Sequence, residues 1–153
     1  MKKSINILNK KARFSYDLLV TYTAGIVLTG TEIKSIRASK ASIAESFCEF
    51  NDSGELFVIN MTVQEYDHGN HFNHRPKAER KLLLNKKELR KLEKEVKNTG
   101  LTIIPTKLFI NEKGFAKLKI ALAKGKKLFD KRETIKDREN KRNLDRIKKN
   151  FKP

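Results

Sequence analysis

The alternation of apolar and polar residues predicts a chain built mainly from short strands. Tyr16 to Thr23 alternates large side chains with mixed ones, and Gly25 to Leu28 continues this strand or pairs with it after a bend at Ala24-Gly25. Phe47 to Phe50 and Leu56 to Val63 flank an Asn-Asp-Ser-Gly cluster, which is typical of a hairpin turn. The pattern therefore indicates a sheet with one buried face.

A second hairpin is predicted closer to the C-terminus. Leu101 to Ile110 leads through an Asn-Glu-Lys-Gly turn into Phe115 to Ala123. In the second arm, apolar residues alternate with Lys117, Lys119 and Ala121. One face of this hairpin is therefore apolar, and the other presents lysines to water or to a ligand.

A helix is predicted between Asn85 and Gly100. Asn85 is a suitable N-cap with Glu88 three positions later, and Gly100 is a suitable end. Its apolar stripe follows the helical spacing: Leu89, Leu92 and Val96. We expect this helix to lie across one opening of the sheet.

Another helix is predicted after Gly30, with Thr31 as its N-cap and Glu32 in its first turn. Ile33 and Ile36 face inward in this prediction, and the outer side is basic, formed by Lys34, Arg37 and Lys40. A short helical turn is also predicted from Asn9 to Ser15, and the polar stretch from Asp67 to Arg80 is predicted to be a long mobile loop.

Short strands in hairpins, interrupted by helices, predict a mainly β fold with peripheral helices. An OB-fold-like small β-barrel accounts for this pattern better than a two-sheet sandwich, although strand propensity alone does not choose between them. We expect one barrel domain over residues 1–123, followed by a basic C-terminal tail over residues 124–153.

The net charge of the chain limits the kinds of molecule that it is expected to bind. The 153 residues carry a formal net charge of +17, and the tail holds thirteen Lys/Arg against five Asp/Glu. Nucleic acid explains this excess better than an anionic membrane surface or a role in solubility alone. No apolar run approaches the roughly 20 residues that span a bilayer, and the N-terminal residues do not resemble a secretory signal. A lone cysteine, Cys48, fits a reducing compartment, so we expect a cytoplasmic protein without membrane partners.

The sequence offers little enzymatic or metal chemistry. His68, His71 and His74 are spaced three apart, but no CxxC accompanies them, and a polar loop explains them better than a metal site. Cys48 lies in a predicted strand and is interpreted as a core residue. We therefore predict a non-enzyme with no catalytic residues, no metal and no cofactor.

Clusters that combine basic and aromatic residues favour RNA binding. Residues 9–13 with Phe14 and Tyr16, the basic side of the predicted helix after Gly30, and the hairpin lysines could together contact phosphates. The aromatic rings could stack on unpaired bases, although core packing is the simpler interpretation for Phe14 and Tyr16.

The tail carries an apolar stripe at helical spacing, formed by Leu144, Ile147 and Phe151. A net charge of +8 repels itself, and isolated helices of this length are marginal in water. The tail is therefore predicted to be disordered when free and helical when bound.

Three blocks of sequence resemble a known family. They are GIVLTGTEIKSIRASKASI (25–43), RKLLLNKKEL (80–89) and AKGKKLFDKRETIKDRE (123–139). In this order and spacing they resemble the SsrA-binding protein (SmpB) family. The resemblance implies an OB-like barrel that binds the tRNA-like domain of transfer-messenger RNA (tmRNA, or SsrA RNA). It also implies delivery of alanylated tmRNA, with elongation factor Tu and GTP, to stalled bacterial ribosomes, where trans-translation tags the incomplete protein and rescues the ribosome.

The resemblance also implies the site residues. The RNA-binding residues would be Asn9, Lys10, Arg13, Glu32, Lys34, Arg37, Leu83, Asn85, Lys124, Gly125, Lys126 and Lys127. The tail residues in the decoding centre and empty mRNA channel, against 16S rRNA of the small subunit, would be Phe129, Asp130, Lys131, Arg132, Lys136, Arg138 and Ile147. Thr23 stands where some members have an acidic residue, and Phe129 stands where His is frequent.

Two other classes of function remain open from the sequence. A structural ribosomal protein that binds rRNA would also be small, basic and tailed, but it would accompany all ribosomes and not preferentially stalled ones. A hydrolytic RNA enzyme is the third alternative, and RNA turnover would reveal it.

Overall fold

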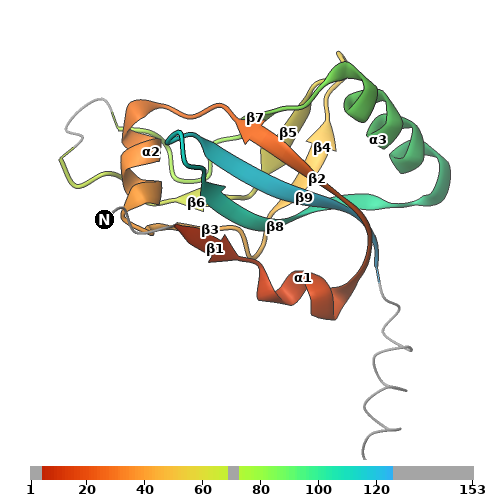
Figure 1. Ribbon diagram of the computed structural model, residues 1–153, viewed down its shortest axis with the longest axis horizontal. Helices are drawn as coiled ribbons and strands as arrows, with labels where there is room; N and C mark the ends of the chain where they lie inside the picture. Colours follow the sequence, from red (N-terminus) through yellow and green to blue (C-terminus); the bar gives the residue numbers. More distant parts are fainter. Residues whose placement is uncertain (1–4, 69–72, 126–153) are drawn as a thin grey trace, which may run out of the picture.

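The computed structural model describes residues 5–68 and 73–125, which form antiparallel sheet with helices around it (Figure 1). The helices are α1 (Lys10–Ser15), α2 (Gly30–Arg37) and α3 (Lys86–Thr99). The strands are β1 (Asn6–Leu8), β2 (Tyr16–Ile26), β3 (Ala41–Ser42), β4 (Phe47–Phe50), β5 (Leu56–Ile59), β6 (Thr62–Val63), β7 (Arg80–Leu83), β8 (Thr102–Ile110) and β9 (Ala116–Gly125). The predicted class, mainly β with peripheral helices, is confirmed.

The large sheet has the strand order β1-β8-β4-β5-β7-β2-β9, and β9 also pairs with β8. The pairings therefore return to a strand already in the sheet, which leaves few free edges. β4 meets β8 at the pair Cys48–Ile103, whereas β8 and β9 pair along most of their length. The β8–β9 hairpin is therefore extensively paired, as its alternation predicted, and β9 pairs over a similar length with β2 on its other edge.

Of the two alternatives for Gly25 to Leu28, continuation of the preceding strand is correct as far as Ile26, and a bend at Ala24-Gly25 is not. β2 is continuous from Tyr16 to Ile26, and its register shifts between Leu18 and Val20 instead. Gly25 is paired on both sides, with Leu83 of β7 and Lys117 of β9. Pairing on both edges keeps the backbone extended through the glycine.

The predicted single strand from Leu56 to Val63 is also wrong in its second half. Asn60 has φ 64, a left-handed conformation that ends β5. The following residues Thr62–Val63 form β6, which pairs with β3 in a separate two-stranded sheet. The hairpin between β4 and β5 itself is confirmed.

The core is filled by aliphatic side chains from both sheets and from α2 and α3. The largest fully buried ones are Ile36, Ile43, Leu56, Met61, Leu82, Leu92, Ile103, Leu108, Leu118 and Ile120. Cys48 is buried among them, as predicted, and burial raises the pKa of its thiol. Core packing is the wrong interpretation for Phe14, which is 63% exposed, whereas Tyr16 packs against Ala12, Ile104 and Ala123.

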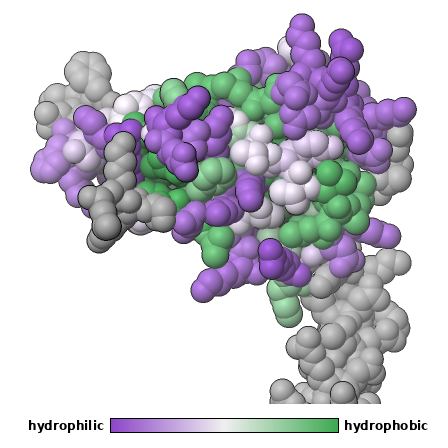
Figure 2. All heavy atoms as spheres, in the orientation of Figure 1, coloured by the Kyte–Doolittle hydropathy of each residue, from purple (hydrophilic) through white to green (hydrophobic). Residues whose placement is uncertain are grey.

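α3 confirms the predicted helix and its caps. The side chain of Asn85 accepts a hydrogen bond from the N–H of Glu88 (2.8 Å), and Gly100 ends the helix with φ 66. Leu92 is buried, and Leu89 and Val96 pack against the core. Hydrophilic side chains gather over the outer side of α3 (Figure 2).

Asn85→Ala is expected to lower the free energy of unfolding by about 1 kcal/mol, because the N–H of Glu88 loses its acceptor. Urea denaturation would measure this loss. Asn85→Asp is the control, since a carboxylate oxygen can accept the same bond and lies well at a helix N-terminus. Equal stability of the alanine and wild-type proteins would contradict the role of this cap.

β9 continues through Lys124 and Gly125, which pair with Asp17 and Tyr16 of β2. These two residues, assigned from the sequence to the tail, lie at the end of the sheet. The tail prediction itself concerns residues 126–153, which lie outside the described residues.

Candidate nucleic-acid interface

The outer face of β2, β9 and β8 carries a row of lysines. Lys119 of β9 is paired with Thr23 of β2 on one side and with Lys107 of β8 on the other. Lys117 lies in the next row, between Gly25 and Phe109, and the Lys107 Nζ atom lies 5.3 Å from the centroid of the Phe109 ring. The three lysines are half-buried, so their stems lie on the sheet while the charges are accessible.

No acidic residue balances this row from its own strands. β8 and β9, which carry the three lysines, contain no Asp or Glu, and Asp17 of the adjacent β2 pairs in register with Lys124 near the end of β9. No ion pair holds Lys107, Lys117 or Lys119 among the described residues. Three uncompensated ammonium groups on adjacent strands attract anions, and a polyphosphate backbone suits their repeating arrangement.

Apolar side chains border the lysine row. Leu83 of β7 is 53% exposed beside Gly25, and Leu8 of β1 is 58% exposed opposite Lys107. A Cβ atom at Gly25 would lie 3.4 Å from the Leu83 Cβ atom and 3.7 Å from the Lys117 Nζ atom. A side chain at Gly25 would therefore contact both an apolar group and a cation, and the glycine keeps the backbone accessible at this point of the surface.

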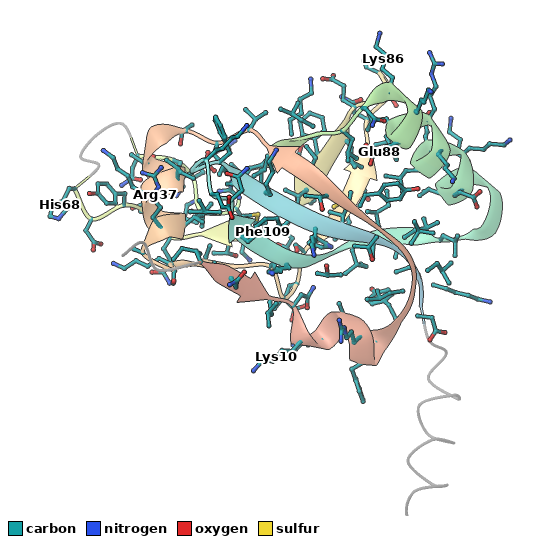
Figure 3. The ribbon with its side chains drawn as sticks, in the orientation of Figure 1. Lys10, Arg37, His68, Lys86, Glu88 and Phe109 are labelled. Atoms are coloured by element: carbon teal, nitrogen blue, oxygen red, sulfur yellow. The ribbon has the colours of Figure 1, made fainter. Side chains whose placement is uncertain are left out.

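α2 continues the basic surface at the tip of the β8–β9 hairpin. Lys34 and Arg37 are both exposed, and a Cβ atom at Gly114 in the hairpin turn would lie 3.8 Å from Arg37 Nη2. Arg37 lies toward the end of the sheet that carries Phe109 (Figure 3). Arg37 of α2 therefore lies close to the turn of the hairpin whose strands carry the lysine row.

The N-cap of α2 is Thr29 and not the predicted Thr31. The Thr29 hydroxyl accepts from the N–H of Glu32 (3.4 Å), and Glu32 Oε1 accepts from the N–H of Thr29 (2.9 Å), which forms a capping box. Thr31 lies in the first turn, where its hydroxyl is 2.9 Å from His74 Nδ1. The helix ends at Arg37, because Ser39 has φ 60, so Lys40 lies beyond it.

Glu32 is buried and forms an ion pair with the buried guanidinium of Arg80. Burial alone would raise the pKa of Glu32, but the Thr29 N–H and the Arg80 guanidinium outweigh it and hold the pKa below its usual value. Arg80 also donates to four backbone carbonyls, those of Met61, Arg75, Pro76 and Ala78, at 2.8–3.3 Å. Through Arg80, Glu32 therefore positions α2 against the segment 75–80.

The role of Arg80 was missed because it was assigned to the end of a loop. Arg80 begins β7, and it lies on the same face as the buried Leu82 two positions later. The alternation with a period of two in residues 80–83 was the sequence signal that could have placed Arg80 on the buried face. The partner of Arg80 is Glu32, 48 positions earlier in the chain, and the local pattern could not predict this pairing.

The described parts of the predicted mobile loop are held by hydrogen bonds. Tyr66 and Asn73 exchange two bonds of 3.1 and 2.7 Å, and both ring nitrogens of His74 are engaged, by Thr31 and by the carbonyl oxygen of Val63 (2.9 Å each). His71 lies outside the described residues. The described part of the chain contains no group of three metal-ligating side chains.

α1 carries two further predicted site residues, Lys10 and Arg13, both exposed. Asn9, in contrast, is buried and donates to the carbonyl oxygens of Ile43 (3.2 Å) and Pro105 (2.9 Å). It therefore fixes the start of α1 against the sheet. Lys10 lies at the opposite edge of the molecule from Lys86 of α3 (Figure 3).

The structure brings together only some of the predicted RNA-binding residues. Arg37 lies beside the turn of the β8–β9 hairpin, Leu83 borders the lysine row, and Lys34 lies over the Tyr66 ring. Asn85 lies at the start of α3, and Lys124 and Gly125 lie at the exposed end of β9. Outside the described residues are Lys126, Lys127, Phe129, Asp130, Lys131, Arg132, Lys136, Arg138 and Ile147. Within the described ranges, no helix is long and apolar enough to cross a membrane.

Comparison with known proteins gives consistent matches. The model of the family described as SmpB protein matches residues 6–150. The SsrA-binding protein of Christiangramia forsetii is 70% identical over 152 residues, which cover 99% of this chain and 96% of that protein. The SsrA-binding protein of Agrobacterium fabrum is 52% identical, covering 92% of this chain and 88% of that protein. Among solved structures, a chain of "tmRNA-SmpB: a journey to the center of the bacterial ribosome" matches with TM-score 0.67 and 46% identity, covering 81% of this chain and 86% of that one.

Proposed function

Because this chain belongs to the SmpB protein family, we propose that it binds the tRNA-like domain of tmRNA and delivers it to stalled ribosomes for trans-translation. The observation that carries the proposal is the uncompensated row of Lys107, Lys117 and Lys119 beside α2. Such a row binds phosphates by direct contact and by release of counterions. The protein acts as an RNA-binding factor, and its residues position RNA without bond chemistry.

In this proposal the sheet domain and the basic tail have separate roles. The lysine row, Arg37, Lys34 and Leu83 hold the RNA. The tail from Phe129 onward enters the decoding centre and the empty mRNA channel of the small subunit, next to 16S rRNA. Elongation factor Tu with GTP accompanies the alanylated tmRNA complex, in the bacterial cytoplasm.

A direct test compares RNA partners. Gel-shift titrations with the tRNA-like domain of tmRNA, an ordinary tRNA and a fragment of rRNA should give the tightest binding to the first. Affinity should fall steeply with salt, since each phosphate contact contributes a slope of about −0.9 on a double-stranded region. Equal affinity for all three RNAs would contradict selective tmRNA binding and would favour a structural ribosomal protein.

Lys119→Glu is expected to weaken binding to the tRNA-like domain at least tenfold at about 0.1 M salt. The change removes one phosphate contact, which reduces the salt slope by about 1, and places a repelling charge between Thr23 and Lys107. Filter binding at several salt concentrations would measure both effects.

Lys94→Glu is the matched control, because Lys94 is an exposed lysine of α3 and the change in net charge is identical. It should alter the affinity less than threefold through long-range electrostatics alone. Equal losses in the two variants would contradict a local binding surface.

A further inference from the structure

The basic side chains on and just after α2 differ in the contacts that they make within the protein. The Lys34 Nζ atom lies 5.3 Å from the centroid of the Tyr66 ring, a cation–π contact that leaves the charge uncompensated. Lys40 forms an ion pair with Asp67, with 2.8 Å between Nζ and Oδ2. Arg37 has no ion-pair partner among the described residues.

The pair between Lys40 and Asp67 rests on an ordered backbone. The carbonyl oxygen of Lys40 accepts from the N–H of Gln64 (2.9 Å), which fixes the start of the segment 64–68 beside the end of α2. The two hydrogen bonds between Tyr66 and Asn73 hold the next part, and His68 contacts the Tyr66 ring edge-on at 5.5 Å. His68 projects at the outer end of this segment (Figure 3). Asp67 is therefore held where its carboxylate meets Lys40.

Lys40 itself is less free than a typical surface lysine. Its side chain is 43% exposed, and its ammonium group donates a charged hydrogen bond of 2.8 Å to Oδ2 of Asp67. The Lys40 ammonium correspondingly lowers the pKa of Asp67, so the carboxylate stays charged at neutral pH. A phosphate that approached Lys40 would meet the negative charge of Asp67 at the same place.

We propose that Asp67 keeps Lys40 from binding RNA and so sets the edge of the phosphate-binding surface, leaving Lys34, Arg37 and the lysine row as its active cations. Asp67 is then a specificity-determining residue, because an acidic side chain at the border of a basic surface lowers the affinity of that surface for non-specific phosphates. This inference rests on the proposed RNA-binding function and names the residue that limits it.

The experiment measures the affinity and salt slope of six full-length proteins for a 20-nucleotide oligouridylate and for the tRNA-like domain. They are wild type, Asp67→Asn, Lys40→Gln, the double variant of these two changes, and the reference variants Asp52→Asn and Arg37→Gln. Asp67→Asn should bind the oligouridylate roughly fivefold more tightly at about 0.1 M salt, with a slope steeper by about 0.7, because one more phosphate contact becomes available on a single strand. Lys40→Gln alone should change the affinity less than twofold. In the double variant the gain should disappear.

Asp52→Asn is the matched control, because it removes the same charge from the exposed turn between β4 and β5. It should raise the affinity less than twofold, and melting curves should show all variants folded. The proposal is overturned if Asp67→Asn binds no more tightly than Asp52→Asn, or if Lys40→Gln weakens wild-type binding as much as Arg37→Gln does. Binding to the oligouridylate tests the role of Asp67 even if the protein does not prefer the tRNA-like domain. The absence of that preference would contradict the proposed function and not the role of Asp67.

Discussion

Replacing Arg80 with methionine is expected to destabilise the folded protein by about 3–5 kcal/mol. The change leaves the Glu32 carboxylate buried without its counter-charge, and it removes the donors of the carbonyl groups of Met61, Arg75, Pro76 and Ala78. Denaturant unfolding followed by circular dichroism would measure the loss. For a domain of this size it corresponds to a fall in Tm of roughly 10–25 °C.

Lys81→Met is the control for this prediction. Lys81 is the next residue of β7 and also pairs with a glutamate, Glu55, but both of these side chains are about 40% exposed (43% and 39%). Its loss should cost less than about 1 kcal/mol, because water replaces an exposed partner. A cost for Arg80→Met as small as that for Lys81→Met would show that the buried pair contributes nothing beyond a surface one.

The same pair predicts part of the dependence of stability on pH. The pKa of Glu32 is lower in the folded protein than its ordinary value of 4.5, so the unfolded chain binds the proton more readily. The stabilisation is complete above the ordinary pKa and is lost as the pH falls through the lower folded pKa. Glu32→Gln should therefore be less stable than wild type at pH 7, and the difference should shrink in acid.

Ending the chain before Lys131 is expected to abolish tagging on stalled ribosomes while tmRNA binding stays within about threefold of wild type at physiological salt. The lysine row and Arg37 lie in residues 5–125 and are kept, whereas the segment proposed to enter the mRNA channel is lost. The removed residues carry a net positive charge, so the loss of long-range attraction should be larger at low salt.

Gel-shift titration and a tagging assay on ribosomes stalled without a stop codon would separate the two effects. Full-length Lys119→Glu provides the converse control, since it keeps the tail and weakens the RNA surface. Loss of tmRNA affinity in the truncated protein would contradict the division of labour between the folded domain and the tail.

The elements predicted correctly are those whose signals are local. The β8–β9 hairpin follows from alternation around a short turn, and α3 follows from its stripe and its caps at Asn85 and Gly100. The outward-facing Lys117 and Lys119 follow from the same alternation. In each case residues within a few positions of one another determine the backbone, so the sequence alone was sufficient.

The elements predicted wrongly depend on partners distant in the chain. The glycine at position 25 suggested a bend, but pairing with β7 and β9 keeps β2 straight. Phe14 was interpreted as a core residue because of its type, but the position of α1 leaves it exposed. These outcomes depend on which surfaces meet, and local propensity gives way to tertiary packing.

The sequence by itself determined the net charge of the protein and the class of partner that it binds. A chain of net charge +17 with lysines on alternate positions must attract phosphate. Only the tertiary structure decided which charges are available. Folding pairs Glu32 with Arg80 across 48 positions and Lys40 with Asp67 across 27. Lys107, Lys117 and Lys119 lie on one face, and within residues 5–68 and 73–125 none of them has an ion-pair partner. The physical reason is that charge is a property of each residue, whereas its compensation requires two residues to lie within a few ångströms in space.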